Sequence, residues 1–77
     1  MTPYVIRTRQ VAPGRYRAWA TLAGHRVSRT YGPPPAGCQL PHAWAADQFG
    51  RAVGLAADSW PVWGAAALPT VAFTAWA

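Results

Sequence analysis

Apolar and polar side chains alternate without a break between residues 15 and 22, a pattern that predicts a β-strand with two different faces. The apolar face holds Tyr16, Ala18, Ala20 and Leu22. The polar face holds Arg15, Arg17, Trp19 and Thr21. This segment is the clearest strand in the sequence.

Two further strands are predicted on either side of it. Residues 3–9 are rich in β-favouring side chains, and residues 25–31 alternate again. Pro13-Gly14 marks the first turn and Gly24 the second. The two loops possible around Gly24 keep the same side chains on the same face, so the register of this second hairpin stays open.

Residues 41–53 are the one segment with the apolar spacing of a helix. Pro41 suits the first turn of a helix, and Gly54 after its end predicts a left-handed cap closed by a contact of Leu55. Asp47 and Arg51, four residues apart, are expected to pair on the outer side. The small side chains of the inward stripe would let the helix lie close to a sheet. That stripe consists of Ala45, Phe49, Ala52 and Val53.

Residues 60–77 carry no charged side chain, and the length of this run would be enough for a membrane span. Two prolines and a glycine interrupt the run, and no basic cluster flanks it. The pattern favours two more strands instead, at residues 62–66 and 70–76, after a loop around Asp58-Ser59.

Between the third strand and the helix, residues 32–37 contain three consecutive prolines and predict a stiff connector. We therefore expect a single α+β domain over residues 1–77, with an antiparallel sheet of about five strands packed on one helix. The predicted order of elements is β-β-β-α-β-β.

The charge of the chain points to its partner. Seven arginines stand against two aspartates, with no lysine or glutamate, so the formal net charge is +5 and the pI is near 10.8. A pI above about 9 is typical of nucleic-acid-binding domains. A GC-rich genome would also favour arginine over lysine, but it does not account for the scarcity of acids. We expect a partner that carries phosphates or other concentrated negative charge.

The chain offers few groups for catalysis. Cys38 and His42 have a spacing that would suit a thiolate-imidazole pair, but a lone cysteine beside a helix start is usually a small apolar residue. Three Cys and His residues in all fall short of a structural zinc site. With one cysteine and no secretory signal in the first ten residues, a reducing cytoplasm is expected. We expect no enzyme, no catalytic residue, no metal and no cofactor. The titratable groups weighed for catalysis are Cys38, His25, His42, Asp47 and Asp58.

Five arginines alternate with apolar residues along the first three predicted strands, and we expect them to emerge together from the side away from the helix. For Arg7 and Arg9 this depends on the loop at Pro13-Gly14. A bulge or an odd loop length places them with the other three, whereas a plain two-residue loop places them on the opposite face. The five are Arg7, Arg9, Arg15, Arg17 and Arg26.

Such a face suits phosphate recognition, because guanidinium forks repeat along and between strands at spacings close to those of a nucleotide backbone. Trp19 adds a surface on which a base or an arginine can stack. The alternative is a solvated face kept basic for solubility. The candidate nucleic-acid or partner-binding residues are Arg7, Arg9, Arg15, Arg17, Trp19, Arg26 and Arg29.

Five tryptophans are too many for so small a domain to bury completely. Trp44 precedes the inward stripe of the helix and is expected in the core. Trp60, Trp63 and Trp76 form a candidate protein interface, or else they close the end of a small core.

The stretch from Gly14 to Gly32, with the segments GRYRAW and RVSRTYG ahead of an alanine-rich helix, resembles the arm-type DNA-binding domain of phage integrases. The resemblance covers about half of the chain and implies a three-stranded sheet that enters the major groove of duplex DNA. The triple-proline connector and the strands after the helix depart from that pattern.

In size, element order and lack of catalytic groups the chain also resembles small phage anti-CRISPR proteins. That resemblance implies a non-enzymatic inhibitor, in the cytoplasm of a bacterial host, that occupies a CRISPR effector. A basic inhibitor would engage bound nucleic acid or an acidic protein surface. We therefore expect a regulator of a nucleoprotein complex, with no small-molecule substrate and no membrane partner. A duplex-DNA-binding module and an oligomerising assembly protein are the alternatives.

Overall fold

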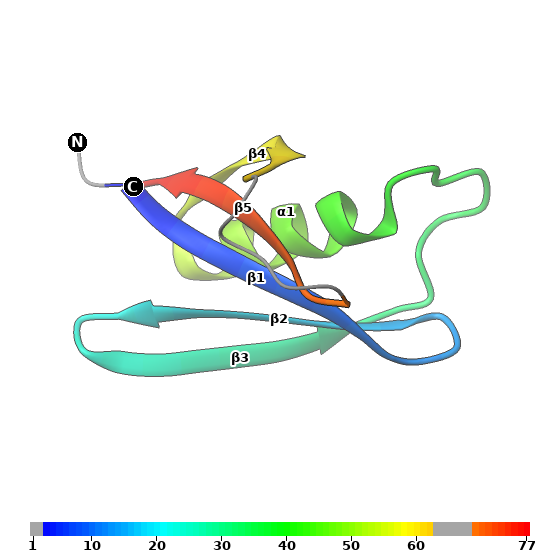
Figure 1. Cartoon of the computed structure of the whole chain (residues 1–77), viewed down its shortest axis with the longest axis horizontal. Coiled ribbons are helices and arrows are strands. Elements are labelled where there is room, and N and C mark those ends of the chain that lie inside the picture. The colour runs from blue at the N-terminus through cyan, green and yellow to red at the C-terminus, as the bar shows by residue number, and fades with distance from the viewer. Residues whose placement is uncertain (1–2, 63–68) are drawn as a thin grey trace.

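A computed structural model describes residues 3–62 and 69–77 and shows one helix lying across one face of a five-stranded antiparallel sheet (Figure 1). This confirms the expected α+β class and its order of elements. The strands lie in the spatial order β3-β2-β1-β5-β4, so β5, the last strand in the sequence, pairs with β1, the first. The elements are β1 (Pro3–Ala12), β2 (Arg15–Leu22), β3 (His25–Tyr31), α1 (Pro41–Val53), β4 (Ala56–Pro61) and β5 (Val71–Trp76).

The hairpin of β1 and β2 combines a two-residue turn at Pro13-Gly14 with a shift of register. Gln10 lies opposite Tyr16, whereas Ala12 lies opposite Arg15. One residue of β1, Val11, is therefore extra, as in a β-bulge. The bulge restores the alternation of the two strands, so that the apolar positions of both face α1.

The hairpin of β2 and β3 closes through Ala23 and Gly24. Both have positive φ angles, +50° and +79°, as a type I′ turn requires. Leu22 lies opposite His25, which decides between the two registers that the sequence left open.

The helix begins and ends where the sequence predicts. Pro41 occupies its first turn, and Gly54 adopts the left-handed conformation at φ +82° and donates its N–H to the carbonyl of Gly50. Leu55 follows with its side chain buried, and its N–H donates to the same carbonyl at 2.7 Å. The part of the chain that the structure describes has no helix long and apolar enough to cross a membrane.

The core lies between α1 and the inner face of the sheet. Phe49 of the helix is completely buried, as is Ile6 of β1, and Phe73 of β5 is almost so. The inward stripe of the helix is shifted from the predicted one, because Ala46 is buried while Ala52 is exposed. The core cluster consists of Ile6, Ala18, Ala20, Ala46, Phe49, Leu55, Phe73 and Ala75.

The fourth strand lies where the sequence predicted a loop. β4 spans Ala56–Pro61, whereas the strand predicted at residues 62–66 falls almost entirely on residues 63–66, which lie outside the described residues. Asp58 and Ser59 suggested a loop, but both side chains are exposed on a strand at the edge of the sheet, where polar residues are well tolerated. The fifth strand agrees with the prediction to within one residue.

Candidate nucleic-acid interface

The register of the first three strands brings most of the predicted arginines to the outer face of the sheet, away from α1. Arg9 lies directly opposite Arg17, and Arg7 lies opposite Trp19. Directly opposite residues of antiparallel strands project to the same side, so the bulge at Val11 places the arginines of β1 with those of β2. We call this surface the arginine face. Its members are Arg7, Arg9, Arg15, Arg17, Trp19 and Arg26, and every one of these arginines is exposed.

Little negative charge compensates the arginine face. Within residues 3–62 and 69–77, the one salt bridge joins Arg51 to Asp47 at 3.0 Å, on the helix and away from the face. No side-chain hydrogen bond of an arginine of the face is found in that part of the chain. Arg9 and Arg17 thus stand side by side as like charges, an arrangement that costs free energy unless an anion binds.

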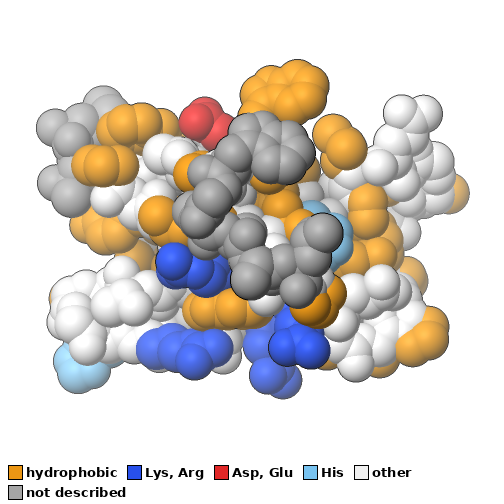
Figure 2. Space-filling model, viewed as in Figure 1, with side chains coloured by type: hydrophobic (Ala, Val, Ile, Leu, Met, Phe, Trp, Pro, Cys, Tyr) orange, Lys and Arg blue, Asp and Glu red, His pale blue; other side chains and the backbone are white. Residues whose placement is uncertain are grey.

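The arginine face is hollowed at its centre. Figure 2 shows arginine side chains gathered over the strands β1, β2 and β3. Among them lies an open concavity of about 390 Å³, within the size range of sites for small ligands. It lies beside the bulge, because Gln10 and Val11 are among its lining residues. We call it the arginine concavity; its lining residues are Arg9, Gln10, Val11, Arg17, Trp19, Arg26 and Thr70.

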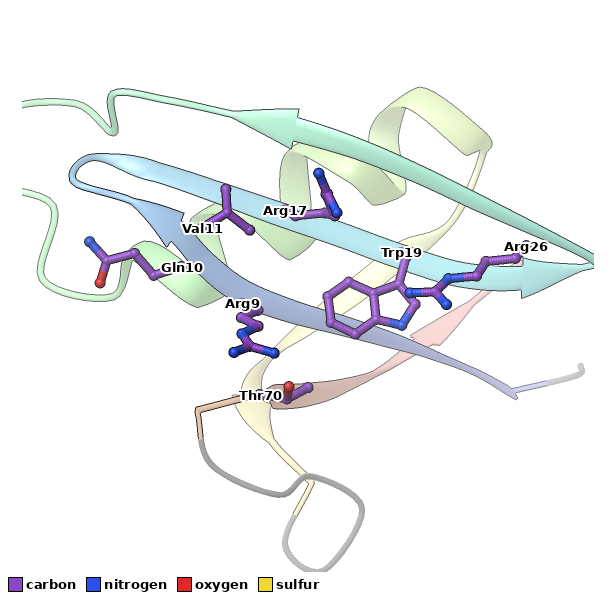
Figure 3. Close-up of a pocket in the computed structure, with 7 residues that line it drawn as sticks. All are labelled: Arg9, Gln10, Val11, Arg17, Trp19, Arg26 and Thr70. Atoms are coloured by element: carbon purple, nitrogen blue, oxygen red, sulfur yellow. The ribbon is translucent and has the colours of Figure 1, made fainter.

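Trp19 lies in the middle of this concavity. Figure 3 shows its indole ring turned broadside to the viewer, between the side chains of Arg9 and Arg26. The guanidinium carbon of Arg26 is 5.3 Å from the ring centroid, a cation–π contact between neighbouring strands. This contact holds the ring in place and leaves it flanked by positive charge.

Arg29 does not belong to the arginine face. It lies opposite Ala18, so it projects to the helix side of β3, where its side chain is exposed at the sheet edge. Burial raises the pKa of Tyr31 nearby, and the charge of Arg29 opposes that rise. Of the seven candidate binding residues, the structure brings six together on one surface and sets Arg29 apart.

His42 has a structural contact on the helix side of the sheet. Its Nδ1 lies 2.8 Å from the hydroxyl of Thr8, and that hydroxyl donates to the carbonyl of Val71 at 3.2 Å. Thr8 is completely buried, so these contacts satisfy a polar group in the core. Burial lowers the pKa of His42 and favours the neutral ring. The described residues contain no group of three or more metal-ligating side chains.

The tryptophans outside the arginine face are dispersed. Trp60 lies near the end of β4 and is 77% exposed. Trp76 lies at the end of β5, opposite the first residue of β4, Ala56, and is partly buried. Trp63 lies outside the described residues. Trp44 packs edge-on against Tyr31, with ring centroids 6.4 Å apart, and is partly buried. The described residues therefore do not show the aromatic interface that the sequence suggested.

Sequence reasoning missed three residues of the concavity, namely Gln10, Val11 and Thr70. The first two belong to the bulge, and Thr70 reaches the site only because β5 pairs with β1. No signal in the sequence pairs these strands.

Comparison of the chain with known proteins gave no match, neither to a protein-family model nor to a curated protein nor to a solved structure. The residues of the arginine face are therefore the basis for assigning a function.

Proposed function

We propose that the protein is a small non-enzymatic binding protein that inhibits or regulates a nucleoprotein complex by engaging its nucleic acid through the arginine face. A CRISPR effector in the cytoplasm of a bacterial host is the complex that the resemblance to anti-CRISPR proteins suggests.

One observation carries this proposal: Arg9 and Arg17 stand directly opposite each other with no carboxylate partner in the described part of the chain. Two like charges in directly opposite positions lower the stability of the sheet, so stability alone does not account for this pair. A phosphate bound between two guanidinium groups would turn this repulsion into two charge-assisted contacts.

The salt dependence of binding tests the proposal. If five arginines contact phosphates, the slope of log K against log salt is about −4.5 for duplex DNA and about −3.5 for a single strand. We expect Arg17→Ala and Arg26→Ala each to weaken binding while the fold persists. Each variant should also make the slope shallower by about the share that one phosphate contact contributes. Affinity is measured by fluorescence anisotropy at several salt concentrations.

Arg51→Ala is the matched control, because it removes the same charge from the opposite layer of the molecule. It should leave the slope almost unchanged. A pull-down from host cells with and without nuclease then identifies the complex. If Arg17→Ala and Arg51→Ala have equal effects, the arginine face is not the binding surface.

A second candidate function is recognition of duplex DNA. The observation in its favour is that β1, β2 and β3 form a continuous three-stranded sheet ahead of α1, as in arm-type domains, with arginines on its outer face. A duplex of random sequence that binds as tightly as any single strand, with the steeper slope, would favour this function.

A further inference from the structure

We propose that the arginine concavity binds one unpaired nucleotide of a single-stranded nucleic acid, with the base stacked on Trp19 and a phosphate held between Arg9 and Arg17. This inference rests on the proposed function and names the form of nucleic acid that the arginine face would take.

The position of Trp19 is the first reason. A face that contacted only phosphates would need charge at its centre, yet an indole ring occupies the centre here (Figure 3). In a duplex the faces of the bases are stacked on one another, and a protein reaches only their edges through the grooves. An unpaired base offers its whole face, and stacking on an aromatic ring is the usual way in which proteins hold it.

The contact of Arg26 with Trp19 is the second reason. Arg26 comes from β3 and Trp19 from β2, and their contact at 5.3 Å fixes the orientation of the ring before any ligand binds. A ring fixed in advance loses less conformational freedom when a base stacks on it. The guanidinium group lies over part of the ring, so a base would stack on the indole beside it or on the guanidinium plane itself, with the positive charge close to the sugar-phosphate backbone.

The pair Arg9 and Arg17 supplies the phosphate subsite. Both line the concavity, and they occupy directly opposite positions of β1 and β2. A guanidinium group presents a planar fork of donors, so two of them can grip one phosphate from two sides. Gln10 and Thr70 also line the concavity and add polar groups suited to the edge of a base.

The shape of the surface is the third reason. The concavity is about 390 Å³ and open, so it accepts a group that projects from a strand. The outside of a duplex is convex on a much larger scale and would pass over such a hollow. A nucleotide turned out of a flexible strand can enter it.

The test compares oligonucleotides that differ in whether they offer an unpaired base to the concavity. Labelled single strands of about 12 nucleotides, within the usual range of site sizes, are compared with a duplex of the same sequence and with an abasic strand of the same charge. We expect the single strand to bind at least about tenfold more tightly than the duplex, and the abasic strand roughly 5- to 150-fold more weakly than the intact one, because base stacking is lost.

Trp19→Leu should reduce affinity for the single strand by a similar factor and leave affinity for the abasic strand unchanged. Trp60→Leu is the matched control, because it removes an exposed indole from β4, outside the concavity. This variant should leave the affinity for both the intact and the abasic strand unchanged. The abasic comparison uses the unaltered protein, so it decides the question even if Trp19→Leu does not fold.

The outcomes separate the two proposals. Equal binding of abasic and intact strands, or of duplex and single strand, overturns the nucleotide site while salt-dependent binding upholds the proposed function. If none of the three oligonucleotides binds at low salt, both proposals fall.

Discussion

Replacement of Arg9 by glutamine should stabilise the protein, although it removes a side chain from the proposed binding site. Arg9 has Arg17 directly opposite and Arg7 two residues away on the same strand and face. Side chains that occupy opposite positions have Cβ atoms about 5 Å apart, and long side chains spread their charges to roughly 7 Å. Glutamine keeps part of the aliphatic stem, so little packing is lost.

The magnitude follows from Coulomb's law. Two unit charges about 7 Å apart in water repel by about 0.6 kcal/mol, so two such neighbours contribute about 1 kcal/mol at low ionic strength. The Debye length falls from about 30 Å at 0.01 M salt to about 3 Å at 1 M, which screens most of this repulsion. For a domain of this size, 1 kcal/mol corresponds to a shift of about 4 to 8 °C in the melting temperature.

Thermal unfolding followed by circular dichroism at 0.01 M and 1 M salt measures this effect. We expect Arg9→Gln to raise the melting temperature by several degrees at low salt and by almost nothing at high salt. Arg51→Gln is the control, because it breaks the 3.0 Å pair with Asp47 and should lower the melting temperature slightly at low salt. A loss of stability in Arg9→Gln, or a gain that is the same at both salt concentrations, would refute the placement of these arginines on one face.

Two further predictions concern the core. Phe49 is completely buried, so Phe49→Ala should cost about 3 to 5 kcal/mol, a large part of the roughly 4 to 12 kcal/mol expected for a chain of 77 residues; urea denaturation showing a loss below about 1 kcal/mol would contradict its place in the core. Burial holds the pKa of His42 below its ordinary value of 6.5, so the unfolded chain binds the proton more readily and stability should fall as the pH drops through 6.5. Denaturation midpoints between pH 7.5 and pH 5 measure this fall, and His42→Gln should flatten it; an equal fall in the variant would assign the effect to another group.

The helix and the strand β2 could be predicted because their signals are local. Pro41 and Gly54 mark the ends of α1, and the strict alternation of residues 15–22 fixes the two faces of β2. β4 could not be predicted in the same way. It is a short edge strand with exposed polar residues, and what makes it a strand is its pairing with β5, far along the chain.

The candidate site could be predicted only in part, for a related reason. Three consecutive side chains of β1 are suited to burial, namely Tyr4, Val5 and Ile6. The sequence therefore does not say whether the odd-numbered or the even-numbered residues of β1 face the core. The orientation of Arg7 and Arg9 follows once Ile6 is seen to be buried. The contact of Arg26 with Trp19 depends on the register of the second hairpin, which the sequence also left open.

The extra residue at Val11 compensates for an odd number of residues between Arg9 and Arg17. Removing Val11 would turn the first connection into a plain two-residue hairpin in which Arg9 still faces Arg17 and Ile6 still points inward. Adding one residue there would allow a four-residue loop, which also closes without a bulge and keeps Arg9 opposite Arg17. Variants of this hairpin that are one residue shorter or one residue longer are therefore both compatible with the same charged surface, and neither needs a bulge.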